Sequence, residues 1–592
     1  MNEAAVNETL TNAQRYLLKQ YNLNGYWSGG LSSSALATAT AVFALAQADA
    51  HAHRETINHG LNWLVATINQ DGGWGDSPES PSNLSTTLIC RAALTVGDLR
   101  NPEYSQARRL VEVWLSGHLG DLEPATIIRA VYELYGDDHS FSAPILAMLA
   151  LAGQLGPADT PWESIAQLPF ELAVFPHTLM SILRLNVVSY ALPALVALGV
   201  LRHRRAPGGQ PLRLFRDMVT KAALRRIRVM QPSDGGYHAA PPLTAFVVMF
   251  LCAAGEKKSE LVRDGVDFLR KNLRPDGGAP ISMNLSVWMT ALATATLLET
   301  KTENVPVKPV RNWLLRRQYM HRHPMTDTPP GGWGWTHLPG SIPDGDDTSA
   351  VLVALRKLES DPMTRVAAER GINWLLQLQN ADGGFPTFCR GWGKLPFDRS
   401  CPDITGKALS ALAAWWGDVP ASMQRRMRTA INRALTYLTR AQQADGQWIP
   451  LWFGNQDAPD MQNPVFGTAL VTHGISQLDQ RTFPEVAGLL ARGRAYLLAT
   501  QNSDGGWGAR HGMDSAIEET GMAICALAGW EPATAAIGHG ADWLVEHTSH
   551  GTAFCAMPIG LYFESLWYSE ALYPVIFTVR ALGCVVGRST TP

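Results

Sequence analysis

The chain has 592 residues, of which 46% are apolar and 17% charged, and this composition excludes a disordered chain. Its 49 Lys and Arg residues nearly balance 52 Asp and Glu residues, so the formal net charge is −3. That balance excludes the strongly basic class of general nucleic-acid binders, and we expect no nucleic-acid partner. The N-terminal segment 1–20 is polar and amphipathic, so we expect no signal peptide there.

A short turn of the form Q/N-x-x-D-G-G-aromatic recurs along the chain, each time after a helical segment with an aromatic–Leu pair. The turns lie near residues 25, 72, 235, 277, 332, 383, 446 and 505. In five copies the aromatic residue lies eight positions before the Asp: Trp63 and Asp71, Phe268 and Asp276, Trp374 and Asp382, Tyr437 and Asp445, Tyr496 and Asp504. A repeat of this period predicts a stack of helical hairpins.

The residues of the turn each have a physical role. Glycine adopts positive φ and ends the helix, and the Asp side chain accepts hydrogen bonds from nearby backbone N–H groups. We expect the tryptophan to lie on the neighbouring repeat, where it adds a large apolar contact. Ala- and Leu-rich stretches at helical period lie between the turns, as in Ala35–Ala46 and Ala408–Trp416. The sequence therefore predicts an all-α fold of helical hairpins closed into toroids.

The segment 170–230 has a different composition. Residues 187–201 are apolar, but this run has only 15 residues and contains Pro193, so it is too short for a transmembrane helix. A basic run follows it, made of Arg202, His203, Arg204, Arg205, Arg213, Arg216, Lys221, Arg225, Arg226 and Arg228. Two interpretations stay open: a buried helix followed by a solvated one, or a membrane-contacting region whose basic rim meets anionic lipid.

The segment 343–350, PDGDDTSA, places three carboxylates within four residues, directly before an apolar helical run. The plain interpretation is a helix start, with Asp347 or Thr348 as the N-cap and acidic side chains near the positive end of the helix. The chemical interpretation is a Brønsted acid, because crowded and desolvated carboxyls raise one another's pKa. A neutral acid shielded from water can protonate an alkene, and aromatic faces then stabilise the carbocation by about 0.5–2 kcal/mol each.

These two patterns together resemble the class II terpene cyclases of the squalene–hopene cyclase family. DGDDTSA is similar to their DxDD motif and the recurring turns to their QW repeats, over most of the chain. The resemblance implies two α/α-barrel domains, one inserted in the other: 1–29 with 254–592 carrying DxDD, and 30–253 as the insertion. It also implies a monotopic protein at the cytoplasmic face of a membrane, a hydrophobic isoprenoid substrate, and no metal or organic cofactor; a homodimer stays open.

The resemblance assigns roles to individual residues. Asp346 matches the proton donor, Asp344 and Asp347 match the flanking carboxylates that sustain its acidity, and Asp403 matches a further acid of the same network. Matches to aromatic residues of the substrate cavity are Trp288, Trp335, Phe388, Trp448, Trp452, Phe466, Phe554 and Tyr562. Each of these aromatics could equally be an ordinary core residue.

Three positions depart from the family pattern. Lys407 replaces the histidine that hydrogen-bonds the catalytic Asp, and a neighbouring ammonium favours the anion of an acid. Lys407 would instead have to pair with Asp344, Asp347 or Asp403, or lose its proton on burial. Phe466 replaces a tyrosine that helps to re-protonate the acid, and acidic residues at the far end of the cavity are missing, with Ile89 near one such position. These departures concern the product more than the reaction class.

We therefore predict a cofactor-free class II terpene cyclase that protonates and cyclises squalene or a squalene-like C30 polyprene. The alternatives are cyclisation of a prenyl diphosphate such as geranylgeranyl diphosphate, or a non-catalytic lipid-binding toroid with a decayed acid site. A two-carboxylate glycosidase would need polar surroundings, which the DxDD segment lacks. A prenyltransferase-like zinc enzyme would need Asp, Cys and His ligands, and the seven cysteines form no CxxC pair and no regular spacing.

Overall fold

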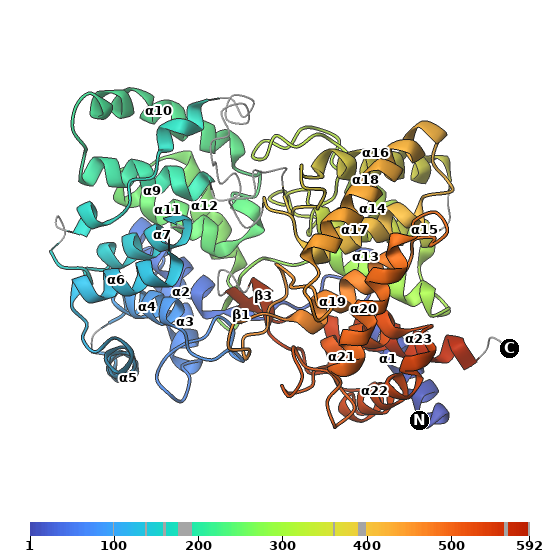
Figure 1. Ribbon diagram of the computed structural model, residues 1–592. Coiled ribbons are helices and arrows are strands. Elements are labelled where there is room, and N and C mark those ends of the chain that lie inside the picture. The colour runs from blue at the N-terminus through green and yellow to red at the C-terminus, as the bar shows by residue number, and fades with distance from the viewer. Residues whose placement is uncertain are drawn as a thin grey trace. The chain divides into compact units, whose positions relative to one another are not determined.

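The computed structural model describes residues 1–98, 100–136, 139–157, 161–175, 192–358, 361–388, 398–561 and 566–589 (Figure 1). The chain divides into two compact units. Unit 1 contains residues 1–30, 284–337 and 341–592, and unit 2 contains residues 31–283 and 338–340. Both units are built from helices, which confirms the predicted all-α class.

In unit 1, six of the described helices form a closed inner ring, each packed against the next and the last against the first. They are α13 (Ser286–Glu299), α15 (Gly345–Lys357), α17 (Pro402–Ala414), α19 (Pro464–Ile475), α21 (Ile517–Leu527) and α23 (Tyr573–Ser589). The outer helices are α1 (Glu3–Lys19), α14 (Val307–Leu315), α16 (Pro362–Leu378), α18 (Ala421–Ala441), α20 (Glu485–Ala499) and α22 (Thr534–His547), with the short η4 (Glu531–Ala533) before α22. Inner and outer helices alternate along the chain, so the inner helices all run in the same direction.

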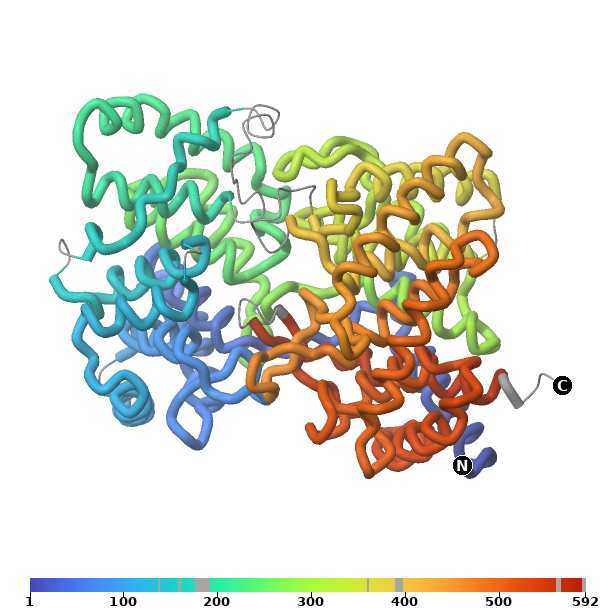
Figure 2. The backbone as a smooth tube through the Cα atoms, viewed as in Figure 1, coloured from blue at the N-terminus to red at the C-terminus, as the bar shows by residue number. Residues whose placement is uncertain are grey.

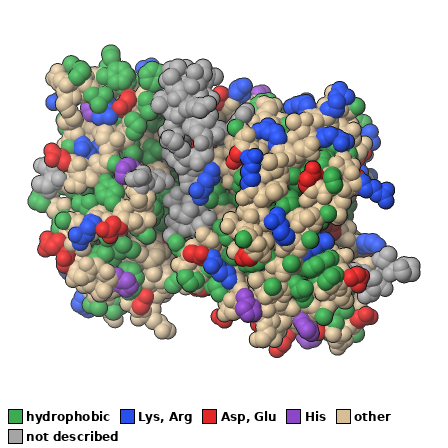
Figure 3. Space-filling view, in the orientation of Figure 1, with side chains coloured by type: hydrophobic (Ala, Val, Ile, Leu, Met, Phe, Trp, Pro, Cys, Tyr) green, Lys and Arg blue, Asp and Glu red, His purple; other side chains and the backbone are tan. Residues whose placement is uncertain are grey.

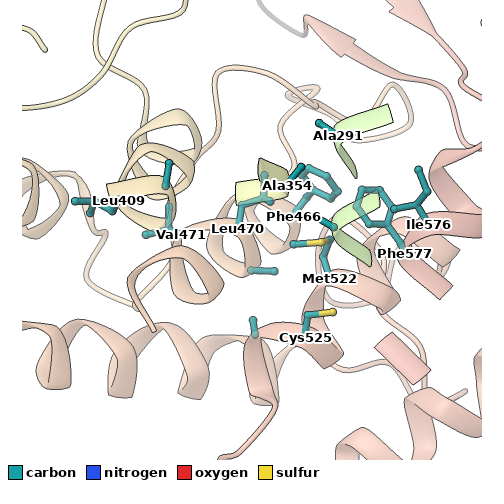
Figure 4. Close-up of a cluster of buried hydrophobic side chains, with 14 of the residues drawn as sticks. Ala291, Ala354, Leu409, Phe466, Leu470, Val471, Met522, Cys525, Ile576 and Phe577 are labelled. Carbon is teal, nitrogen blue, oxygen red and sulfur yellow. The ribbon is translucent and has the colours of Figure 1, made fainter. Parts of the chain in front are cut away.

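Most residues of the inner helices are buried because both faces of these helices are covered. In α19, eleven of twelve residues are buried, and in α21 all eleven are. Small residues allow close approach, as where Gly474 of α19 meets the backbone of Gly406 in α17. Figure 4 shows the interior of this ring, where Ala291, Phe466, Met522 and Phe577 from four different helices point toward one another.

The recurring turn has the predicted geometry. The first glycine after the Asp has positive φ in every copy with that pattern, for example +92° at Gly72, +100° at Gly383 and +93° at Gly505. The Asp Oδ1 accepts a hydrogen bond from the N–H two residues later, at 3.1 Å from Gly384 to Asp382 and 2.9 Å from Gly506 to Asp504. Both predictions about the turn are confirmed.

The tryptophan of the turn contacts two repeats at once. Its indole Nε1 donates to a carbonyl ten residues earlier, at 2.9 Å from Trp448 to Leu438 and 2.7 Å from Trp507 to Leu497. The far edge of the same ring packs against a glycine in the next outer helix, Gly493 for Trp448 and Gly540 for Trp507. The predicted contact with the neighbouring repeat is therefore present, and it needs a glycine that the sequence analysis did not notice.

The glutamine of the turn also joins successive repeats. Gln379 Nε2 donates to the carbonyl of Gly383 and to that of Ala430 in α18, both at 2.8 Å. Gln501 makes the equivalent pair of hydrogen bonds, at 2.7 Å to Gly505 and 2.8 Å to Ala536. Each glutamine therefore ties its own turn to the next outer helix, α18 for Gln379 and α22 for Gln501.

Unit 2 has the same plan, with five inner helices in its described part that also close into a ring. They are α2 (Ala35–Asp49), α4 (Leu84–Leu94), α7 (His139–Leu151), α9 (Leu192–Arg205) and α11 (Pro241–Ala253). Around them lie α3 (Arg54–Ala66), α5 (Pro102–Leu119), α6 (Pro124–Tyr135), α10 (Leu212–Met230) and α12 (Glu260–Asn272), with short turns η1 (Pro161–Ser164), η2 (Phe170–Val174) and η3 (Tyr237–Ala239).

The described part of the chain has two small antiparallel sheets. In unit 2, β1 (Ser33–Ser34) pairs with β2 (Ala279–Pro280), and in unit 1, β3 (Ile559–Leu561) pairs with β4 (Leu566–Tyr568). Both chain ends belong to unit 1, where the N-terminal helix α1 packs beside the C-terminal helix α23 (Figure 2). This contact joins the first and last repeats of unit 1.

The boundaries between the units differ from the predicted ones, which placed residues 30–253 in the insertion. Residue 30 belongs to unit 1 and residues 338–340 to unit 2, and the largest difference is that unit 2 also includes residues 254–283. The reason is that α12 packs on α11 and α2, and β2 pairs with β1. The turn at Gly277 belongs with this last repeat, because a Cβ there would lie 2.4 Å from the carbonyl of His59 in α3.

The basic run 202–228 is largely engaged within unit 2. Arg216 is buried and forms a two-pronged pair with Glu171, at 3.1 and 2.9 Å. Further pairs join His203 to Asp217 at 2.7 Å, Arg204 to Glu256 at 2.7 Å, and Arg228 to Asp264 at 2.8 Å. Among the residues coloured by type in Figure 3, Lys and Arg side chains are scattered over the face shown. No helix in the described ranges is long and apolar enough to span a membrane.

Candidate active site

The inner helices of unit 1 bring acidic side chains to one rim of the barrel. Each inner helix follows an outer helix and its turn, so the N-termini of the inner helices lie at the same end. Asp344, Asp346 and Asp347 lie at the start of α15, and Asp403 lies in the first turn of α17, the next helix in the ring. The spacing of the residues could not show this adjacency, because more than fifty residues separate the two segments, but the family resemblance implied it.

The helix α15 begins at Gly345, so its N-cap is Asp344 and neither Asp347 nor Thr348 as the sequence suggested. Asp344 Oδ1 accepts the backbone N–H of Asp347 at 2.7 Å. The close approach of the neighbouring segment explains the glycine that follows, since a Cβ on Gly345 would lie 2.8 Å from the carbonyl of Pro386. Gly345 N–H donates to the carbonyl of Thr387 at 2.7 Å, which fixes that segment against the start of the helix.

Asp344 and Asp347 are buried side by side, with exposed fractions of 2% and 5%. Burial, followed by the neighbouring charge of Asp346, raises the pKa of Asp344 to about 7. Burial and then the charge of Asp344 raise the pKa of Asp347 well above its usual range. A hydrogen bond between the two carboxyls favours the anion of Asp344 and the acid form of Asp347. This pair therefore holds at least one proton at neutral pH.

Asp346 is the most exposed carboxyl of the three, and it faces Lys407. The Lys407 Nζ lies 2.7 Å from Asp346 Oδ1 and 3.0 Å from Oδ2, and both side chains are 15% exposed. The ammonium also lies 4.7 Å from the ring centre of Trp288 and 4.9 Å from that of Phe453. Of the two alternatives left open for Lys407, pairing with Asp344, Asp347 or Asp403 in place of Asp346 is not the arrangement in the structure. Asp344 caps its own helix and Asp347 bonds to Asp344, so Asp346 is the carboxylate left facing α17.

Asp403 lies one helical turn before Lys407 and is fully buried. Its Oδ1 accepts a hydrogen bond from the Cys401 thiol and another from the Leu451 N–H at 3.3 Å. Burial raises the pKa of Asp403, and the charge of Lys407 opposes this rise. The acids that surround Lys407 therefore belong to two helices of the ring.

An apolar cavity lies inside the ring of unit 1, next to Lys407. Its walls come from the six inner helices and one loop of the same unit, and small side chains such as Ala291, Ala295 and Ala350 leave the space open. Aromatic side chains on the wall are Trp288, Phe453, Phe466, Tyr573 and Phe577. Ser349 and Ala350 of the wall follow Asp346 by one turn of α15, so Asp346 lies one helical turn from the cavity wall.

Two of the predicted cavity aromatics, Trp288 and Phe466, line this cavity. Trp335, Phe388 and Trp452 lie instead around segment 385–388 beside the DxDD turn. The rings of Trp335 and Phe388 are 6.1 Å apart, and Trp452 Nε1 donates to Thr387 Oγ1 at 2.9 Å. These three side chains therefore surround the start of α15.

The other predicted aromatics have different places. Trp448 is the fully buried tryptophan of a repeat turn, and Phe554 packs on Tyr16 of outer helix α1, with ring centres 5.2 Å apart. Neither lines the cavity described above. Tyr562 lies outside the described residues.

The sequence analysis missed three aromatics of the cavity wall, namely Phe453, Tyr573 and Phe577. Phe453 directly follows Trp452, and Tyr573 and Phe577 are four residues apart on α23, which places them on one helix face. That spacing was a usable signal for the last two. Phe453 has φ of +58°, a left-handed backbone conformation that the neighbouring residues do not predict.

A second charged group closes the opposite end of the cavity. Arg580 and Lys357 pair with Glu299 at 3.1 and 3.0 Å, and Arg580 Nη2 donates to His473 Nε2 at 3.0 Å. Burial acts against the charge of Glu299, yet the charges of Arg580 and Lys357 outweigh it and lower its pKa to about 2. Burial, together with Arg580, lowers the pKa of His473 to about 3, so this imidazole is neutral. No group of three or more metal-binding side chains occurs within the described part of the chain.

Comparison with known proteins places this site in a family. The model of the squalene–hopene cyclase N-terminal domain matches residues 10–113, and that of the C-terminal domain matches residues 285–558. A squalene hopane cyclase of Aspergillus fumigatus is 26% identical, over 86% of this chain and 78% of its own length. A drimenyl diphosphate synthase of Streptomyces showdoensis is 33% identical over 43% of this chain and 42% of that protein.

Matches to most other curated relatives cover about half of their length or less. Among solved structures, ent-copalyl diphosphate synthase from Streptomyces platensis has a TM-score of 0.60 and 18% identity, covering 99% of this chain and 100% of that one. This likeness shows a shared fold. With its family models, its DxDD turn and its ring of helical repeats, the chain belongs to the squalene–hopene cyclase family of class II terpene cyclases.

Proposed function

We propose that this protein protonates and cyclises a linear polyprene, squalene or a similar C30 isoprenoid, to a cyclic triterpene. The observation that carries the proposal is the contact of Asp346 with Lys407, which lines an apolar cavity with aromatic walls, beside two buried carboxyls of raised pKa. Such a site suits an alkene, which offers no polar group for recognition and needs a strong acid shielded from water.

In the proposed reaction, the acid form of Asp346 transfers its proton to the terminal double bond of the folded substrate. A new C–H bond forms, the π electrons of the neighbouring double bond close the first ring, and the positive charge moves along the chain. The faces of Trp288, Phe453 and Phe466 line the start of this path and stabilise the charge. Loss of a proton or capture of water ends the cascade.

Membrane association forms a separate part of the proposal. An apolar substrate of this size resides in lipid, and the outer helix α10 presents apolar side chains to solvent beside its basic ones. Leu214, Met218 and Val229 of α10 are 57%, 73% and 68% exposed. Amphipathic helices of this composition bind the surface of anionic bilayers. Co-sedimentation with anionic vesicles should fall when Met218 and Val229 are both changed to Asp.

A prenyl diphosphate is the second candidate substrate, because one relative is a drimenyl diphosphate synthase at 33% identity over part of the chain. Against it, Arg204, Arg216 and Arg228 of the basic run are engaged in ion pairs with acidic side chains of unit 2. A product assay with each substrate distinguishes the two candidate functions.

Purified protein in detergent would receive squalene or geranylgeranyl diphosphate, with phosphatase treatment of the second, and products would be separated by gas chromatography. A cyclic C30 product that is absent with Asp346→Asn supports the proposed function. Product from the diphosphate alone would replace it with the second candidate. No product from either, with folded protein, would favour the non-catalytic lipid-binding alternative.

A further inference from the structure

The ion pair between Lys407 and Asp346 creates a chemical problem for the proposed reaction. An ionised Asp346 cannot protonate an alkene, and the ammonium at 2.7 Å stabilises that ionised form. The Asp344–Asp347 pair holds a proton, but both of these carboxyls are buried, and Asp346 is the one that is accessible. Asp346 must therefore receive the proton that it donates from another group, while it stays in contact with Lys407.

We propose that Lys407 stores this proton and transfers it to Asp346 when the substrate fills the cavity. The inference rests on the proposed function and names the proton source of that same site. The step is Lys–NH₃⁺ plus Asp–COO⁻ giving Lys–NH₂ plus Asp–COOH, along the existing contact between Nζ and the carboxylate. One N–H bond breaks and one O–H bond forms, with no change in total charge.

Desolvation provides the driving force for the transfer. Lys407 lines the cavity and contacts Asp346 at 2.7 Å, so an apolar ligand there removes water from one member of this ion pair. Ions in an apolar medium lose several kcal/mol of solvation each, and a neutral acid–amine pair does not bear this cost. A lysine can give up its proton under such conditions, whereas an arginine keeps it.

The aromatic walls act in the same direction. In the structure, the ammonium lies over the faces of Trp288 and Phe453, at 4.7 and 4.9 Å. Each face stabilises a cation by about 0.5–2 kcal/mol. A polyprene that packs on those faces displaces the ammonium from them, so the ionised state of Lys407 loses its second source of stabilisation.

The other titratable groups near the Lys407–Asp346 pair disfavour a further negative charge in the site. They are Asp344 and Asp347 on α15, Cys401 and Asp403 before and on α17, Tyr568 on β4 and Tyr573 on α23. All of them have a raised pKa, so they tend to stay neutral beside Asp346. After the substrate takes the proton, Asp346 is again a carboxylate, and Lys407 recovers a proton from water as the product leaves.

Infrared difference spectroscopy with squalane, the saturated analogue of squalene, tests the transfer directly. Squalane fills an apolar cavity but has no double bond to protonate. Its binding should produce the carbonyl band of a protonated carboxyl, absent in both Asp346→Asn and Lys407→Arg. Squalane that binds without a new band overturns the inference and leaves the proposed function intact. Failure of squalane to bind would count against the proposed substrate class itself, and the inference would fall with it.

The kinetics of two substitutions separate a proton store from a simple charge partner. Lys407→Arg keeps the charge and should lower kcat about 100-fold with little change in KM. Lys407→Gln should be most active at low pH and lose activity as the pH rises, because it has no stored proton to give, whereas the wild type stays level from pH 6 to 8. An arginine variant as active as the wild type, or a glutamine variant with the wild-type pH profile, overturns the inference. The glutamine profile decides alone if the arginine variant does not fold.

Discussion

Trp288 on α13 donates its indole N–H to the phenol oxygen of Tyr573 on α23 at 2.8 Å, across the point where the ring of unit 1 closes. Both side chains are buried and line the cavity next to Lys407. The hydrogen bond fixes the plane of the indole, so that one face meets the ammonium at 4.7 Å. The closure of the fold and the shape of the site therefore depend on the same pair of residues.

Replacing this tryptophan should affect catalysis more than stability. Trp288→Phe keeps an aromatic face but loses the hydrogen bond to Tyr573, and we expect kcat to fall about tenfold, which corresponds to about 1.4 kcal/mol. Product profiles by gas chromatography should show more incompletely cyclised material, because the wall no longer holds one orientation. Tyr573→Phe is the matched control that removes the same hydrogen bond from the other side. Unchanged rates in both variants would contradict this role.

Removal of the acid is the most direct test of the site. Asp346→Asn is nearly the same size and cannot supply a proton to an alkene, so we expect at least a 1,000-fold loss of kcat, about 4 kcal/mol. The melting temperature should be measured beside kcat, because the substitution leaves the Lys407 ammonium without its carboxylate and lowers stability separately from catalysis. Turnover in this variant within tenfold of the wild type would mean that another group donates the proton.

Asp344 makes stability depend on pH in a defined direction. Its pKa is raised from about 3.8 to about 7 in the folded protein, so the folded state holds a proton that the unfolded chain releases between these values. Stability from this group is therefore complete below about pH 4 and is lost as the pH rises to about 7. Asp344→Asn removes the titration and can still cap α15, since Asn is a good N-cap.

The melting temperature of Asp344→Asn should exceed that of the wild type by about 2 °C or more at pH 8, with a smaller difference at pH 5. Thermal unfolding at the two pH values measures this directly. Asp361→Asn provides the control, because Asp361 caps α16 in the same way but is not a buried acid. An equal effect of Asp344→Asn at both pH values would show that its burial is not the cause.

The first glycine of the repeat turn should not tolerate substitution by a residue with a side chain. At Gly383, φ is +100° and a Cβ would lie 2.3 Å from the backbone carbonyl of Arg433, so two penalties combine. Gly383→Ala should destabilise unit 1 by about 2–4 kcal/mol. Gly488, exposed in α20 with nothing near its Cβ position, is the control, and Gly488→Ala should stabilise the helix by about 0.5–1 kcal/mol. Denaturant unfolding of both variants distinguishes the two effects, and equal stabilities would contradict the turn geometry.

Much of the repeat could be predicted from the sequence because its contacts are local. The Asp of the turn bonds to an N–H two residues later, and the tryptophan bonds to a carbonyl ten residues earlier, as at Asp504 and Trp507. Both partners of such a contact lie within one repeat, so the contact recurs wherever the repeat recurs and can be predicted from the sequence. The glycine of the next outer helix, such as Gly540 under Trp507, was missed because its partner lies in another repeat.

The class of fold, the turn chemistry and the three carboxylates at the start of one helix could be predicted from the residues alone. The partner of each carboxylate could not, because it depends on how the helices pack. Lys407 pairs with Asp346 across 61 positions, and helix capping removes Asp344 from the choice. Likewise, Trp448 turned out to be a repeat tryptophan while Phe453 lines the cavity. Closure of the ring brings together helices that are far apart in the sequence. These contacts produce no repeating pattern of residues, so the sequence does not predict them.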